Sequence, residues 1–74
     1  MTTRILYAVD TSTGERLRLM TLHPDGSLTA EASYIAEAVP VYRDKHGFSD
    51  EFIFEYTKRR GNGYVRYVEE TVED

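Results

Sequence analysis

The residues best suited to binding chemistry are the cations near the C-terminal end of the chain. Three of them are consecutive, a fourth follows a glycine-rich turn, and tyrosines lie between them. Cationic side chains neutralise phosphates, and tyrosine rings stack on unpaired bases, so the segment is a candidate contact for nucleic acid or for another partner. The candidate contact residues are Lys58, Arg59, Arg60, Tyr64, Arg66 and Tyr67.

A structural role at a helix end is the simpler explanation of the same cations. Three basic residues in the last turn of a helix stabilise the negative end of its dipole. Residues 69–74, EETVED, carry four acids and no base, so the chain also supplies its own acidic counterpart. The cluster therefore has three alternatives to nucleic acid: a solvated helix end, the acidic segment of this chain, or an acidic protein partner. Arg43 and Lys45 are further candidate members of the cluster.

The remaining motifs do not predict catalysis. The segment VDTSTGE, residues 9–15, lacks the G-x-x-x-x-G-K-[ST] pattern of a phosphate loop and suits an ordinary hairpin turn. His23 and Asp25 can be drawn as an acid–base pair, but a histidine before proline in a turn is usually a surface residue. No serine lies in a G-x-S-x-G context, and Glu51 and Glu55 suit a solvated helix face.

These observations predict a protein that is not an enzyme and that needs no cofactor. No nucleophile, base and oxyanion donor come together in the sequence. His23 and His46 supply at most half of a zinc site, and there is no cysteine to complete it. A chain of 74 residues also has little room for a deep pocket, so no small-molecule substrate is expected.

Composition indicates a single small domain, residues 1–74, with a thin core. The absence of cysteine favours a reducing compartment, and no apolar run is long enough for a signal peptide or a membrane span. We therefore expect a cytoplasmic protein that does not enter membranes. The net charge of −4 arises mostly from residues 69–74, which we expect to form a solvated acidic tail.

Two strands and a tight turn are expected at the N-terminus. Residues 3–9, TRILYAV, alternate and are rich in β-branched and aromatic side chains, and residues 16–23, RLRLMTLH, begin with the same alternation. The apolar pattern in the second segment then shifts to Met20 and Leu22, which predicts a bulge or a strand covered on both faces. Gly14 provides positive φ for the connection, so we predict a β-hairpin.

A helix is expected after the turn HPDG. Thr29 is a plausible N-cap, and the apolar side chains that follow recur at helical spacing. Pro40 removes a backbone donor, so the helix should kink there or restart and run on to Lys45. Gly47 is placed to end it.

Residues 50–60 are ambiguous between helix and strand. Phe52, Phe54 and Tyr56 alternate with other residues as in a strand, and the G-N-G sequence at 61–63 would serve as a hairpin turn. A helix is favoured by Ser49 as N-cap, by acids in the first turn and by cations in the last. Residues 63–69 form a strand under either interpretation.

The sequence thus predicts an α+β domain with the element order ββααβ. The alternative order is ββαββ, in which residues 50–58 and 63–69 form a second hairpin.

The six tyrosines suggest how such a domain acts. They cannot all be buried in so small a protein, and exposed tyrosine is enriched at protein interfaces. The leading hypothesis is a protein-binding or regulatory module that docks on another protein or on itself, such as an accessory or inhibitor protein of a phage or mobile element. The alternative is a nucleic-acid-binding protein that uses the basic, tyrosine-containing segment 58–66.

Overall fold

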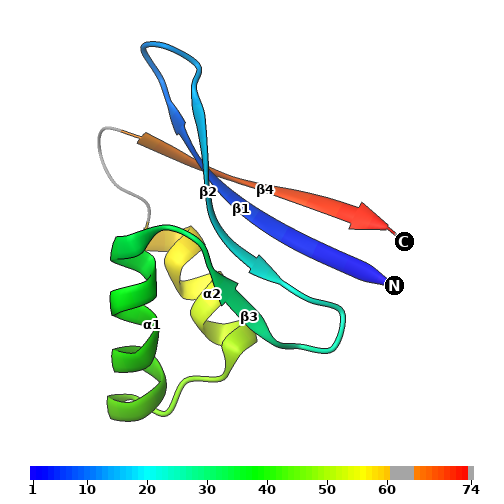
Figure 1. The fold of residues 1–74 in the computed structure, drawn as a ribbon, viewed down its shortest axis with the longest axis vertical. Helices are drawn as coiled ribbons and strands as arrows, with labels where there is room; N and C mark the ends of the chain where they lie inside the picture. Colours follow the sequence, from blue (N-terminus) through cyan, green and yellow to red (C-terminus); the bar gives the residue numbers. More distant parts are fainter. Residues whose placement is uncertain (61–64, 74) are drawn as a thin grey trace.

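The chain folds into a four-stranded antiparallel sheet with two helices on one of its faces (Figure 1). The computed structural model describes residues 1–60 and 65–73. The strand order is β3-β2-β1-β4. This is the predicted ββααβ α+β fold with one short strand added. The elements are β1 (Thr2–Asp10), β2 (Arg16–Leu22), β3 (Leu28–Ala30), α1 (Ser33–Lys45), α2 (Asp50–Arg60) and β4 (Val65–Glu73).

The predicted N-terminal hairpin is confirmed, with a bulge in its second strand. Leu6 pairs with Met20 but Tyr7 pairs with Arg18, so Leu19 is the extra residue. The bulge turns both Leu19 and Met20 into the core, where each is fully buried. The connection from residue 10 to residue 15 is an ordinary turn, because the Asp10 carboxylate accepts hydrogen bonds from two backbone N–H groups and one hydroxyl within it.

The expectation that the first helix begins near Thr29 is wrong. Residues Leu28–Ala30 form a third strand that pairs with β2, and Leu28 and Ala30 pack against the core. The bulged Leu19 carbonyl then accepts the N–H groups of Glu31 and Ala32, at 2.8 and 3.2 Å. Sheet pairing with a distant segment therefore overrides local helix preference, and α1 begins at Ser33 without a side-chain cap.

The expected restart at Pro40 is also wrong, because α1 is a single helix that continues through Pro40 to Lys45. The proline is exposed, while Ile35 and Val39 are buried on the opposite side of the helix. Packing of that apolar face offsets the backbone hydrogen bond that proline cannot donate. The helix ends as predicted at Gly47, which has a φ of 66°.

Residues 50–60 are helical, so the hairpin alternative ββαββ is wrong. The Ser49 hydroxyl accepts the Phe52 N–H at 3.2 Å, which confirms the predicted N-cap. Acids occupy the first turn of α2 and cations the last, as the dipole favours. The residues at the two ends of α2 thus decide between helix and strand, which the interior residues alone do not distinguish.

The last strand is longer than predicted. β4 runs to Glu73 and pairs with β1 over nine consecutive positions, from Thr2 opposite Glu73 to Asp10 opposite Val65. As far as Glu73, the acidic segment is therefore sheet and not a free tail. Residues 61–64 of the predicted turn and strand, together with Asp74, lie outside the described residues.

The two faces of the sheet have different roles. On the inner face, Leu6 and Leu22 meet Ile35, Ile53 and Phe54 of the helices in one apolar core. The outer face carries alternate residues of the same strands, and the helices do not cover it. This division determines which predicted contact residues can act together.

Candidate functional site

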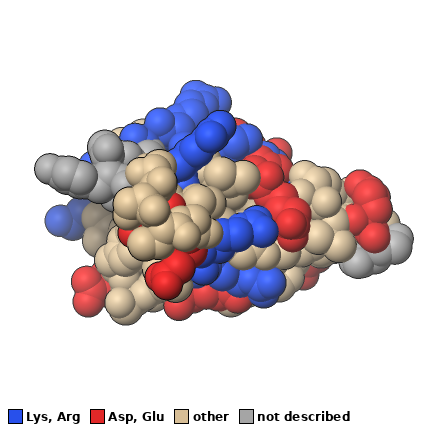
Figure 2. Space-filling view, turned by 90° about the horizontal axis from the view of Figure 1, so that it is seen from above, with Lys and Arg blue, Asp and Glu red and all other residues tan. Residues whose placement is uncertain are grey.

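The cations at the end of α2 do not form one patch. Lys58 points to the sheet, Arg59 lies beside the acids of its own helix, and Arg60 points to α1. On the face of the molecule drawn in Figure 2, Lys and Arg atoms form several groups with other atoms between them. Adjacent positions on a helix differ by about 100° in direction, so the three side chains diverge.

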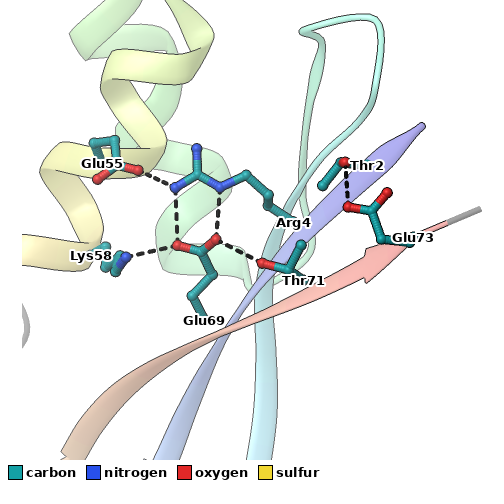
Figure 3. Close-up of polar contacts among 7 residues, drawn as sticks. All are labelled: Thr2, Arg4, Glu55, Lys58, Glu69, Thr71 and Glu73. Carbon is teal, nitrogen blue, oxygen red and sulfur yellow. Dashed lines mark hydrogen bonds and ion pairs between the residues drawn. The ribbon is translucent and has the colours of Figure 1, made fainter.

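Lys58 belongs to an ion-pair network between α2 and the sheet (Figure 3). Its ammonium lies 2.7 Å from Glu69 of β4, in the predicted acidic segment. Arg4 of β1 donates two hydrogen bonds to the same carboxylate, at 2.7 and 3.0 Å, and another to Glu55 of α2. The Arg4 guanidinium also lies 4.8 Å from the centre of the Phe54 ring. Three elements are therefore joined by two cations and two carboxylates.

The electrostatics of this network indicate a structural role. Hydrogen bonds from Arg4, opposed by burial and assisted by Lys58, lower the pKa of Glu69 from 4.5 to about 2. The hydrogen bond to Glu69 likewise raises the pKa of Arg4. The side chain of Glu69 is only 14% exposed. Lys58 thus stabilises a half-buried carboxylate of its own chain, which is one of the alternatives that the sequence left open.

Arg59, Arg66 and Tyr64 do not join Lys58. Arg59 is exposed and lines a shallow surface with Glu51 and Glu55, so acids surround its charge. Arg66 is exposed on the outer face of β4, because it pairs with Val9 while Tyr67 pairs with the inward-facing Ala8. Tyr64 lies outside the described residues. Arg43, the further candidate, is 2.7 Å from Asp50 and ties α1 to α2.

Arg60 and Tyr67 do come together, in a cleft between α1, α2 and β4. The cleft has a volume of about 270 Å³. The Arg60 guanidinium donates to the Tyr42 hydroxyl at 2.9 Å, and its carbon lies 6.0 Å from the centre of the Tyr56 ring. The lining residues are Tyr34, Ile35, Ala38, Val39, Tyr42, Thr57, Arg60 and Tyr67.

The polar groups of the cleft favour an acidic occupant. Arg60 is the one charged residue among the described residues that line it, and its pKa is raised by the hydrogen bond with Tyr42. Burial, with a hydrogen bond to Tyr67, raises the pKa of Tyr34 to about 12. The phenol therefore keeps its proton over the physiological range and remains able to donate it in a hydrogen bond. Three tyrosines and one arginine thus surround a floor of aliphatic side chains.

Aromatic rings continue from the cleft across the junction of the two helices. Tyr42 packs edge-on against Tyr56 with ring centres 5.3 Å apart, and it stacks on Phe48 at 6.0 Å. Phe52 lies 4.6 Å from Phe48 and is 47% exposed. Tyr34, at the other end of the cleft, is also 47% exposed. Among the described tyrosines only Tyr34, on α1, is exposed; the others are partly buried.

No protein-family model, curated protein or solved structure matches this chain. The proposed function therefore rests on the geometry of the described residues.

Sequence reasoning found Arg60 and Tyr67 but did not select Tyr34 and Tyr42 as site residues. The sequence feature that could have identified these two tyrosines is the spacing of Tyr34, Ala38 and Tyr42. They are four residues apart and therefore share one helical face. A shared face of an amphipathic helix normally packs against the core. Because β4 turns Tyr67 inward beside α1, the edge of the core opens into a cleft instead.

The residues considered for catalysis serve the turns. The Asp25 carboxylate accepts the backbone N–H and the hydroxyl of Ser27, at 2.9 and 2.6 Å, which lowers its pKa. His23 contacts the Thr29 hydroxyl at 2.7 Å instead of an acid. Among residues 1–60 and 65–73, no group of three acidic or histidine side chains is arranged to hold a metal ion. Within the same ranges, neither helix has the length and apolar character that a membrane span requires.

Proposed function

We propose that this protein is a non-enzymatic, cytoplasmic binding module that docks on another protein through the cleft between α1 and β4. The observation that carries the proposal is the pairing of a cationic rim with a tyrosine-lined apolar floor. Tyrosine and arginine are the residues that most often dominate the energy of protein interfaces. An accessory or regulatory role, like that of small phage-encoded or mobile-element proteins, fits a module of this kind.

The size and polar groups of the cleft support one kind of partner segment. A volume of about 270 Å³ is below the roughly 300–1,000 Å³ of typical small-molecule sites, and it suits one or two side chains. The partner segment should therefore insert an apolar side chain over Ile35 and Val39. A carboxylate next to that side chain would pair with Arg60, and its backbone would reach the hydroxyls of Tyr34 and Tyr67.

A peptide-display selection tests this proposal. A randomised peptide library is selected against the immobilised chain, and enriched peptides are then titrated into isotope-labelled protein by NMR. We expect sequences in which an apolar residue adjoins Asp or Glu, with shift changes at Tyr34, Tyr42 and Tyr67. Arg60→Ala should weaken binding by about tenfold or more, because a charged hydrogen bond is lost.

The neighbouring arginine provides the matched control. Arg59 is of the same type, is exposed and lies in the same helical turn, but it is outside the cleft. Arg59→Ala should therefore leave peptide affinity within about twofold. Equal loss in both variants would mean that only general charge is recognised. Absence of acidic–apolar peptides from the selection would refute the proposed partner chemistry.

Nucleic-acid binding remains the second hypothesis, and the exposed Arg59 and Arg66 are the observation that favours it. These cations lie on different surfaces, so a nucleic acid would have to wrap around the end of α2 and the outer face of β4. The test is a titration with mixed short DNA and RNA at low and moderate salt. Shifts at residues 58–60 and 65–67 that disappear with salt would favour this function over the peptide site.

A further inference from the structure

Over residues 66–73, the outer edge of β4 is the longest strand edge in the described part of the chain with which no other described strand pairs. β4 pairs with β1 on one side, and no strand among residues 1–60 and 65–73 pairs with its other side. In Figure 1 it lies at the margin of the sheet, on the far side of β1 from β2. The opposite edge strand, β3, is only three residues long. A long edge is a template for another strand.

Few of the usual protective features are present along this edge. Residues Val65–Glu73 contain no proline and no lysine, and the pairing with β1 continues without a register shift. Charge is the remaining protection, and it is carried by Arg66, Glu69, Glu70 and Glu73. The arrangement of these charges therefore decides which added strand the edge accepts.

The charges alternate between the two faces of β4. Arg66, Val68 and Glu70 are on the outer face, whereas Glu69 is on the inner face and is held by Arg4 and Lys58. Arg66 forms no ion pair with any described residue. Glu70 has one long contact, 3.8 Å from Arg16, and both side chains are 47% exposed. One free cation and one loosely held anion thus flank a half-buried valine.

We propose that two copies of this chain associate through the outer edges of their β4 strands, antiparallel and centred on Val68. In this register Arg66 of each copy lies opposite Glu70 of the other, and the two valines meet at the two-fold axis. Directly opposed side chains are about 4.5–5.5 Å apart, close enough for both ion pairs to form. The sequence of the edge is therefore complementary to itself.

The neighbouring registers are less favourable. A two-fold axis perpendicular to the sheet keeps each face continuous, so only residues of the same face can be opposed and the register can shift only in steps of two. If the two-fold axis moves from Val68 to the next residue, Glu69 of one copy lies opposite Glu69 of the other. If it moves one residue further, the two Glu70 side chains lie opposite each other. Like charges directly opposed destabilise a strand pair. Within residues 65–73, the register centred on Val68 alone pairs opposite charges.

Charge reversal tests this dimer. Sedimentation of the full chain is measured from micromolar to millimolar concentration for the original sequence, Arg66→Glu, Glu70→Arg and the double variant. We expect a reversible dimer in the original chain. Each single reversal opposes like charges twice and should weaken the dimer by about tenfold or more, and the double variant should restore it to within about threefold. A chain that stays monomeric throughout, or a double variant as weak as the singles, overturns the proposal.

Cysteine trapping tests the register independently. The sequence contains no cysteine, so a single introduced thiol reports only on contact between copies. Val68→Cys should form an intermolecular disulfide rapidly under mild oxidation, because it faces its own copy across the axis. Val72→Cys is the matched control, since Val72 lies on the same face but four residues from the two-fold axis, so its two copies do not face each other in this register. Cross-linking at Val72 as fast as at Val68 would exclude the register.

The dimer and the peptide site can fail separately. Arg60→Ala removes the cationic group of the cleft but lies outside the β4 edge, so it should leave the sedimentation profile unchanged. Arg66→Glu should weaken the dimer without removing peptide binding. Loss of both properties in either variant would indicate misfolding, and NMR spectra of each variant distinguish that case.

Discussion

Lys58 and Arg60 are two residues apart on α2, yet they lie in regions of opposite character. Lys58 enters a network in which two cations and two carboxylates neutralise one another. Arg60 enters a cleft whose described lining residues include three tyrosines and no carboxylate. The charges of the first region balance one another, and in the second we propose that Arg60 is available to a partner.

This difference shows how to separate stabilising from functional cations in a small domain. The network is 14% exposed at Glu69 and lies between three elements, so it contributes to folding. The cleft contains half-exposed Tyr34 and the exposed Arg60, so changes there should affect binding with little effect on stability. The following predictions compare the two regions, in order of decreasing effect.

The largest effect is expected from Arg4→Met. The variant keeps most of the apolar stem but removes both hydrogen bonds to Glu69, the bond to Glu55 and the contact with Phe54. We expect the free energy of unfolding to fall by about 2–3 kcal/mol, because partly buried carboxylates lose their main partner. Urea denaturation of Arg4→Met, Glu69→Gln and the double variant gives the coupling energy. A coupling energy near zero would contradict the network.

The second effect is the pH dependence that Glu69 confers. Its pKa falls from 4.5 to about 2 on folding, so its contribution is fully present above about pH 4.5 and is lost as the pH falls to about 2. A shift of this size is worth at most about 3 kcal/mol, and we expect about 1–2 kcal/mol after solvent screening. Urea denaturation at several pH values should show the difference between the original chain and Glu69→Gln shrinking over that range. A constant difference would refute the assignment.

The smallest effects distinguish Lys58 from Arg60 directly. Lys58→Ala should cost about 0.5–1 kcal/mol, since its half-exposed ion pair supports Glu69. Arg60→Ala should have a smaller effect than Lys58→Ala, because Arg60 is exposed and contacts a tyrosine that packs against the core without it. Denaturation midpoints of the two variants provide the test. A larger loss for Arg60→Ala would mean that the cleft serves stability and not binding.

Local chemistry made much of the fold predictable. The hairpin followed from alternation and from the turn between residues 10 and 15, and α2 followed from Ser49 and the charged residues at its two ends. The errors arose where distant segments compete with local preference. Residues 28–30 became a strand because β2 offered them pairing partners, and α1 continued through Pro40 because Val39 and Ile35 are buried beside it.

The candidate site was predictable only in part. Charge and aromatic content identified the segment 58–67, and two of its members, Arg60 and Tyr67, line the cleft. The grouping of all six residues could not be tested from sequence, because helix rotation and strand alternation send neighbouring side chains in different directions. Tyr42 and Tyr34 join the cleft from α1, 18 and 26 residues before Arg60 in the sequence.

The sequence by itself determined the element types at both ends of the chain, the turns and the supply of cations, acids and tyrosines, because these depend on backbone preference and composition. Only the tertiary structure decided how those charges are used. Pairing of β4 with β1 brings Glu69 to Arg4 and Lys58. It also directs Tyr67, on the same face of β4 as Glu69, into the cleft that Arg60 lines. The physical reason is that Coulombic and packing energies depend on distance in space, which the chain sets only after its sheet has closed.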